Sequence, residues 1–296
     1  MIETGKIYCE DCSETMKRMD DNSVDIILTS PPYRRKSTEI PLAEVFRSDD
    51  YSENDSPRDH AEWITNLFVN DFDRILSKDG VILWNQSYAA SRHGEEYQPD
   101  MLLKTLASIV ENTPFSVADR IVWKKTMVTP NNMSKNLLTR VCEDFYVFVR
   151  KSELKTFNAN KKVVSVRKTG QKNYENIPNF VVAKVSDQVC PYKATFSSDL
   201  VMKLLRIYVS RDGMLVYDPF IGTGSTAIGC MRFGHGISWI GSEISEEQWN
   251  WANDRISNYS PEQFLSKSEK DNAIEDRPIR NFMDLFFEVS HESEQI

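Results

Sequence analysis

The chain has few cysteines and histidines, the residues from which most zinc sites are built. Its 296 residues include five cysteines and four histidines. Cys9 and Cys12 form a C-x-x-C pair, but no second pair or nearby histidine completes the ligand set of a structural zinc ion. We therefore predict no metal site. The odd number and scattered positions of the cysteines are typical of reduced thiols.

Long apolar runs are also missing. No window of the sequence is long and apolar enough to span a bilayer, and residues 1–5 do not resemble a signal peptide. We therefore expect a soluble, cytoplasmic protein with no membrane partner. Hydrophobic residues still make up 40% of the chain, which is enough for a core, and the length fits one catalytic domain with a small insertion.

Positive charge is in the minority. The formal net charge of −8 does not favour nucleic-acid binding, so the distribution of charge matters more. Arg34, Arg35 and Lys36 form one basic run, and residues 150–172 form another in which Glu153 is the single acid. The acids gather at 49–59 and 262–294. A charge run is usually a solvated face, but a basic stripe on an acidic body can also bind phosphate groups.

The stretch 25–33 reads as a short buried strand that stops at two prolines. Residues 25–28 form a brief apolar run, and Pro31 and Pro32 cannot continue a sheet ladder. A residue before proline is held extended, so the turn fixes the Ser30 hydroxyl, bare carbonyls and the Tyr33 ring at the carboxyl end of a strand. Open α/β sheets bind ligands at that edge. The alternative is a proline turn in which Tyr33 only packs.

A second stretch, 216–226, reads as a strand, a glycine loop and the start of a helix. Gly222 and Gly224 let backbone N–H groups approach a ligand closely, and Asp218 at the strand end can accept a hydrogen bond from a cationic amine. The next predicted strand, 235–243, ends in Glu243, an acid that could bind both hydroxyls of a ribose. The glycine pattern is weak alone, but the two stretches together are much more specific.

Ser30-Pro-Pro-Tyr33 and Asp218-Pro-Phe-Ile-Gly-Thr-Gly-Ser225 together resemble the paired motifs of the β-group amino-methyltransferases of DNA, found in many restriction–modification systems. The resemblance runs from about Ile7 to Ile256, with a poorly matched middle. It implies a Rossmann-like α/β sheet with helices on both faces, circularly permuted because the proline loop here precedes the glycine loop. It also implies S-adenosyl-L-methionine as cofactor and double-stranded DNA as substrate. A cognate restriction endonuclease, as a functional partner, and a homodimer stay open.

The resemblance assigns further residues to the cofactor. In the family, an acid after the strand that precedes the proline loop approaches the adenine; Asp11 matches that place, and it could also cap a helix at 13–19. Lys193, Ala194 and Phe196 match a motif that packs against the methionine end, whereas Ser197 replaces the usual proline. The cofactor residues expected are Asp11, Thr29, Lys193, Phe196, Asp218, Pro219, Phe220, Gly222, Gly224, Ser225, Thr226 and Glu243.

The catalytic residues implied are Ser30, Pro31, Pro32 and Tyr33, set against a base flipped out of the duplex. The exocyclic amino group of a base is a poor nucleophile, because its lone pair is delocalised into the ring. Ser30 Oγ and the Pro31 carbonyl could each accept an amino hydrogen and favour a tetrahedral nitrogen, while Tyr33 stacks on the base. The methyl group is then transferred directly and in line, with no covalent enzyme intermediate.

Several activities compete for this interpretation. Serine at the first motif position favours cytosine N4 as the target in the family, and adenine N6 is the alternative. A C5-cytosine enzyme is excluded, since it needs a Pro-Cys nucleophile motif that the sequence lacks. An RNA methyltransferase and a nicotinamide oxidoreductase are more distant alternatives. The oxidoreductase fits the glycine loop and Glu243 but does not explain the proline loop.

The sequence divides into four predicted parts. Residues 1–151 form the first part of the catalytic domain, 152–189 a target-recognition insertion, 190–260 the cofactor-binding part, and 261–296 an acidic tail with a docking helix at 281–289. Within the first part we expect a loop at 34–57, an amphipathic helix at 60–76 and strands at 81–84 and 119–123. The expected DNA contacts are Arg34, Arg35, Lys36, Lys161, Lys162, Arg167, Lys168 and Lys172.

Overall fold

The computed structural model describes residues 2–32, 57–86, 101–126, 128, 130, 135, 138–187, 195–234 and 236–261. Five of the sequence predictions lie wholly or mostly outside these residues. They concern Tyr33, the basic run 34–36, the loop 34–57, Lys193 and the docking helix at 281–289.

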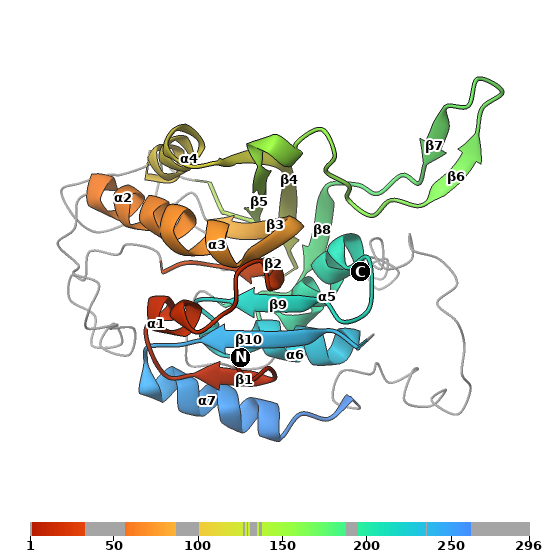
Figure 1. Cartoon of the computed structure of the whole chain (residues 1–296). Coiled ribbons are helices and arrows are strands. Elements are labelled where there is room, and N and C mark those ends of the chain that lie inside the picture. The colour runs from red at the N-terminus through yellow and green to blue at the C-terminus, as the bar shows by residue number, and fades with distance from the viewer. Residues whose placement is uncertain are drawn as a thin grey trace.

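One eight-stranded sheet organises the described residues, with the strand order β1-β10-β9-β2-β3-β5-β4-β8 (Figure 1). Its first five strands pair in parallel, β5 runs antiparallel to both β3 and β4, and β8 pairs in parallel with β4. The strands are β1 (Lys6–Tyr8), β2 (Val24–Thr29), β3 (Leu76–Gln86), β4 (Phe115–Lys125), β5 (Cys142–Arg150), β8 (Phe180–Ala183), β9 (Leu215–Asp218) and β10 (Ser238–Ser242).

Strands β2 and β9 lie side by side at the centre of the sheet, although they come from opposite ends of the chain. Ile26 pairs with Val216 and Ile27 with Tyr217. The strand before the proline loop therefore neighbours the strand before the glycine loop, and both point the same way. This arrangement confirms the predicted circular permutation, in which the sheet is kept while the order of its strands along the chain changes.

Helices cover both faces of the sheet, as predicted (Figure 1). One core cluster joins the sheet to α5 (Ser198–Tyr208), α6 (Ser225–Phe233) and α7 (Glu246–Ser257). The other joins it to α1 (Cys12–Lys17), α2 (Pro57–Leu67), the π-helical turn η2 (Phe68–Phe72), α3 (Asp73–Ile75) and α4 (Met101–Asn112). Along β2, Ile26 and Leu28 face the first cluster and Ile27 faces the second, because successive side chains of a strand point to opposite faces.

The helix predicted at 60–76 is interrupted. α2 ends at Leu67, a π-helical turn follows, and β3 already begins at Leu76 rather than at residue 81. The inserted turn brings the rings of Phe68 and Phe72 to 5.4 and 6.4 Å from the ring of Trp84. The π-helical turn therefore accompanies the packing of these aromatic rings against the sheet, and the helical spacing of apolar residues in the sequence did not predict this turn.

A narrow hairpin projects from the body between β5 and β8 (Figure 1). Its strands β6 (Val163–Val166) and β7 (Lys172–Tyr174) form a separate antiparallel sheet, closed by a turn in which Gly170 has a φ of 82°. We call this hairpin, residues 163–174, the arm. The stretch predicted as a recognition insertion thus contains both the arm and β8, and β8 belongs to the main sheet.

Candidate functional site

A hydrogen bond joins the two loop-bearing strands where both end. Thr29, the last residue of β2, donates from Oγ1 to Asp218 Oδ1 of β9 over 2.6 Å, although the two residues are 189 positions apart in sequence. The proline and glycine loops start from this point, at the carboxyl edge of the parallel strands. Open α/β sheets bind their ligands at such an edge, so the two sequence motifs form one candidate site.

Asp218 is buried, with 1% of its surface exposed. Besides the bond from Thr29, its Oδ2 accepts from Thr226 Oγ1 over 2.5 Å and its Oδ1 from the Phe220 N–H over 3.1 Å. Burial raises the pKa of this carboxyl to about 6, and the bonds from Thr226, Thr29 and Phe220 act in the opposite direction. The carboxylate therefore holds β2, β9 and the start of α6 together, a role that the sequence alone did not predict.

The glycine loop needs its glycines for backbone conformation. Gly222 and Gly224 have φ values of 52° and 79°, in the left-handed region that other residues rarely adopt. A Cβ on Gly224 would also lie 3.2 Å from the Cβ of Ala252 in α7. The loop thus packs closely against α7, with Ser225 and Thr226 opening helix α6 behind it.

Glu243 belongs to the same unit. Its Oε2 accepts from the Gly222 N–H and its Oε1 from the Ser245 N–H, both over 2.9 Å. Burial raises the pKa of this carboxyl, while the backbone N–H groups of Ser245 and Gly222 lower it. Glu243 is thus held by backbone N–H groups on both of its oxygens. The predicted acid therefore lies against the glycine loop.

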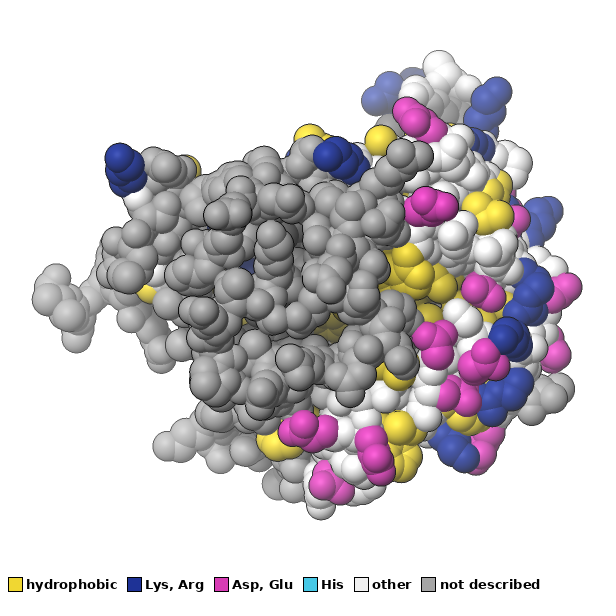
Figure 2. Space-filling view, turned by 90° about the vertical axis from the view of Figure 1, so that its left-hand side faces the viewer, with side chains coloured by type: hydrophobic (Ala, Val, Ile, Leu, Met, Phe, Trp, Pro, Cys, Tyr) yellow, Lys and Arg dark blue, Asp and Glu magenta, His cyan; other side chains and the backbone are white. Residues whose placement is uncertain are grey.

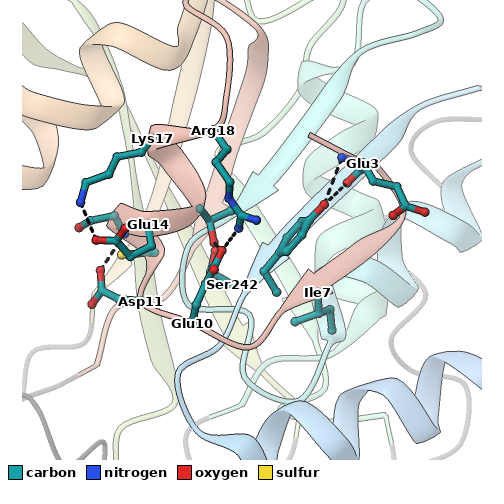
Figure 3. Close-up of polar contacts among 12 residues, drawn as sticks. Glu3, Ile7, Glu10, Asp11, Glu14, Lys17, Arg18 and Ser242 are labelled. Atoms are coloured by element: carbon teal, nitrogen blue, oxygen red, sulfur yellow. Dashed lines mark hydrogen bonds and ion pairs between the residues drawn. The ribbon is translucent and has the colours of Figure 1, made fainter. Parts of the chain in front are cut away.

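Asp11 follows β1, whose Tyr8 pairs with Ser242 just before Glu243. Its Oδ1 accepts from the Ser13 N–H over 2.8 Å, so Asp11 is the N-cap of α1, one of its two predicted roles. Figure 3 shows the neighbouring Glu10 turned toward Arg18, with which it pairs. Asp11 and Glu243 thus follow adjacent strands at the same edge, and a cofactor contact of Asp11 stays a prediction.

The proline loop is supported by a residue that the sequence motifs did not single out. Ser30 Oγ donates to Asn85 Oδ1 over 3.1 Å, and Asn85 Nδ2 donates to the Asp144 carbonyl over 3.0 Å. Asn85 is 1% exposed at the end of β3. Pro31 is buried and Pro32 exposed. No local signal in the sequence distinguishes Asn85, because Gln86 beside it is also polar and buried at the end of β3.

Three further predicted cofactor residues lie in the described part of the chain. Phe196 is buried, its ring 6.2 Å from that of Phe145. Phe220 is half-buried, and its ring lies 5.7 Å from that of Trp63 in α2. Pro219 is buried beside it. Ser197, which replaces the proline of the family motif, caps α5 by accepting from the Leu200 N–H over 3.3 Å.

The basic stretch 150–172 divides into two groups. Arg150 donates to the carbonyls of Asp73 and Leu76, and Lys151 to those of Val110 and Thr113, so both cations cap helix ends. Within the basic run 150–172, these two cations therefore have partners inside the protein. The basic side chains exposed on or beside the arm are Lys162, Arg167, Lys168 and Lys172, and Lys161 is half-buried. In Figure 2, Lys and Arg side chains gather on the projection at the upper right.

Metal-ligating side chains do not cluster in the part of the chain that the structure describes. Within it, no group of three or more His, Cys, Asp or Glu side chains could hold a metal ion. Of the C-x-x-C pair, Cys9 is exposed, whereas Cys12 is buried. Among the same described residues, no helix has the length and apolar character needed to cross a membrane.

Comparisons with known proteins identify a family for most of the chain. Residues 24–254 match the model of a family of N6 and N4 methyltransferases described as DNA methylase. The chain is 26% identical over 230 residues to the Type II methyltransferase M.MwoI of Methanothermobacter wolfeii, covering 75% of this chain but only 29% of that protein. It is 24% identical over 286 residues to the Type II methyltransferase M.SmaI of Serratia marcescens, covering 86% of this chain and 91% of that one.

Solved structures show the same fold. The PvuII DNA methyltransferase (cytosine-N4-specific) superposes with a TM-score of 0.63 at 15% identity, covering 97% of this chain and 94% of that one. The structure of the M1.HpyAVI–SAM complex superposes with a TM-score of 0.52 at 21% identity, covering 85% and 98%. At these identities the likeness concerns the arrangement of strands and helices alone.

Proposed function

The chain belongs to the DNA methylase family of N6 and N4 methyltransferases, and we propose that it transfers a methyl group from S-adenosyl-L-methionine to the N4 of a cytosine flipped out of double-stranded DNA. The observation that carries the proposal is the bond between Thr29 and Asp218. It joins the ends of the two strands that lead into the proline loop and the glycine loop, which supports the roles proposed below for these loops.

The residues of the glycine loop fit S-adenosyl-L-methionine. A Cβ on Gly222 would lie 3.5 Å from Gln248 Oε1, so the loop is in contact with α7 at this point and its glycine keeps the backbone accessible on the side that faces Gln248. Glu243, which follows β10 beside the glycine loop, would accept from the ribose hydroxyls, and the half-buried ring of Phe220 offers an apolar face. Asp11 would accept from the adenine amino group. The cofactor, when bound, supplies an electrophilic methyl group on a sulfonium.

The proline loop would prepare the nucleophile. Ser30 Oγ donates its hydrogen to Asn85, so the lone pairs of the same oxygen can accept from the amino group of the base. With the Pro31 carbonyl as a second acceptor, this contact favours a tetrahedral nitrogen in the transition state. Pro32 keeps the turn extended, and Tyr33 would stack on the flipped base.

Double-stranded DNA would be held by the cations of the arm and by those that follow the proline loop. Lys162, Arg167, Lys168 and Lys172 are exposed, so their charge can reach phosphate groups. The half-buried Lys161 and the run Arg34, Arg35 and Lys36 complete the proposed set. The segment 152–189 would then serve as the target-recognition region, and a cognate restriction endonuclease would cleave the unmethylated sequence.

Methyl transfer to defined DNA tests the proposal. The protein is incubated with tritiated S-adenosyl-L-methionine and duplexes of varied sequence, and the product is digested to nucleosides and identified by mass spectrometry. We expect N4-methylcytosine. Formation of N6-methyladenine would instead support the same mechanism acting on adenine. Label on RNA alone, or binding of a nicotinamide dinucleotide without methyl transfer, would contradict the proposal.

A further inference from the structure

Asp187 and Arg255 form a buried ion pair that the site described so far does not use. Their side chains are 7% and 10% exposed, and Arg255 Nη2 pairs with Asp187 Oδ2. Asp187 lies in the segment that follows β8, and Arg255 in the last turn of α7. Burying two charges is costly unless further hydrogen bonds satisfy them, so the other partners of the pair indicate what it holds in place.

The guanidinium of Arg255 is directed at the glycine loop. Its Nη1 donates to the Thr223 carbonyl over 2.9 Å and to Ser225 Oγ over 3.1 Å. Thr223 lies between the two glycines with positive φ, and Ser225 is the first residue of α6. One side chain thus holds two points of a loop whose glycines would otherwise leave it many conformations.

Asp187 holds the other end of Arg255. Its Oδ1 accepts from the Ser198 N–H at the start of α5 over 2.9 Å. The chain between β8 and Asp187 is itself fixed to α5 and its entry, since Ser197 Oγ donates to the Lys184 carbonyl and Thr195 Oγ1 to the Val185 carbonyl. The segment that leads out of the arm region is therefore connected through Arg255 to the cofactor loop.

We propose that Arg255 and Asp187 are positioning residues that keep the glycine loop in its cofactor-binding conformation. The proposal rests on the function proposed above, because it assigns S-adenosyl-L-methionine to this loop. Arg255 acts on the loop through Thr223 and Ser225. The carboxylate of Asp187 binds Ser198 and Arg255, so it acts on the loop through Arg255. A change at Asp187 should therefore weaken cofactor binding as a change at Arg255 does.

The test measures S-adenosyl-L-methionine binding by isothermal titration, well below the unfolding temperature of each variant. We expect Arg255→Gln to raise the dissociation constant at least tenfold and Asp187→Asn to raise it several-fold. The double variant should bind no worse than Arg255→Gln alone. In steady state, KM for the cofactor should rise while kcat at saturating cofactor stays within about twofold. If Arg255→Gln does not fold, Arg255→Lys keeps the charge but has one nitrogen where the guanidinium uses two, Nη1 for the loop and Nη2 for Asp187, so its dissociation constant should still rise.

Arg150→Gln is the matched control. Arg150 is another largely buried arginine, paired with Asp73 and bound to helix-end carbonyls away from the glycine loop. The substitution should lower the unfolding temperature and leave cofactor affinity within twofold. Folded variants of Arg255 and Asp187 that bind the cofactor as the wild type does would overturn the proposal. A wild-type protein that binds no S-adenosyl-L-methionine would instead overturn the proposed function.

Discussion

Replacing Asn85 by leucine should reduce turnover while leaving Ser30 and the glycine loop in place. Asn85 Oδ1 accepts the Ser30 hydroxyl over 3.1 Å, and without that acceptor the hydroxyl can turn toward the amino group of the base as a donor. Ser30 would then donate a hydrogen bond to the amino group, whereas the reaction needs Ser30 to accept one from it. The substitution therefore asks whether the direction of one hydroxyl contributes to catalysis.

The expected magnitude follows from the chemistry of the bond. A hydrogen bond between two neutral groups contributes about 0.5–1.5 kcal/mol, so kcat should fall roughly 2- to 13-fold. Ser30→Ala removes the acceptor itself and should cost on the order of 10²-fold, by analogy with the loss of one oxyanion-hole donor. Leucine also leaves the Asp144 carbonyl without its Asn85 donor, which should lower stability by about 1–3 kcal/mol and is measured separately by denaturant unfolding.

The assay is single-turnover methyl transfer at saturating DNA and cofactor, combined with a double-mutant cycle. If Asn85 acts through Ser30, the change to leucine should have almost no further effect in the Ser30→Ala background. Cofactor affinity should stay unchanged in all three variants. Fully additive effects would refute the reasoning, and so would a Ser30→Ala protein that loses the cofactor rather than turnover.

Three other outcomes are expected. Glu243→Ala should weaken S-adenosyl-L-methionine binding by about 1.5–3 kcal/mol, roughly 10- to 150-fold; unchanged affinity in titration calorimetry would remove Glu243 from the cofactor site. Neutralising the exposed cations on and beside the arm should reduce the slope of log affinity for DNA against log salt by about one for each phosphate group that is no longer neutralised. These cations are Lys162, Arg167, Lys168 and Lys172. The control Lys17→Gln on α1 should leave the slope unchanged. The raised pKa of Asp218, about 6 in the folded protein, means that protonation favours folding. The stabilisation that the folded protein gains from protonated Asp218 is complete below the unfolded pKa of about 3.9 and is lost as pH rises through about 6. The wild type should therefore lose unfolding free energy relative to Asp218→Asn as pH rises from about 4 to 7. A difference between the two proteins that does not change with pH would contradict the raised pKa of Asp218.

The elements that the sequence predicted best are those whose residues restrict the backbone by themselves. Pro31 and Pro32 end β2, and Gly222 and Gly224 supply the positive φ values of the loop after β9. Such restrictions are local, so they can be recognised without knowing the rest of the molecule. The neighbourhood of β2 and β9 is not local. The family resemblance implied a permuted sheet, and the pairing of β2 with β9 in the structure shows how the two loop-bearing strands meet in it.

The features that the sequence did not predict depend on partners far away along the chain. Asn85 became visible only when β3 was placed beside β2, and the π-helical turn depends on Trp84 in the same strand. Arg150 looked like part of a basic stripe because charge can be counted in a sequence. Its helix-end acceptors at Asp73 and Leu76 can be identified only in the fold.

Asp218 shows most clearly how a correctly identified motif can be assigned an incomplete role. The sequence pattern assigned its carboxylate to the cofactor, yet both oxygens accept hydrogen bonds inside the protein. A buried carboxylate is tolerated only where such donors satisfy it, and here Thr29 comes from the strand that carries the proline loop. The residue that begins the glycine motif therefore also fixes the strand of the other motif. The two loops are consequently one structural unit. A change at Thr29 should therefore disturb the glycine loop as well as the proline loop, which follows Thr29 directly.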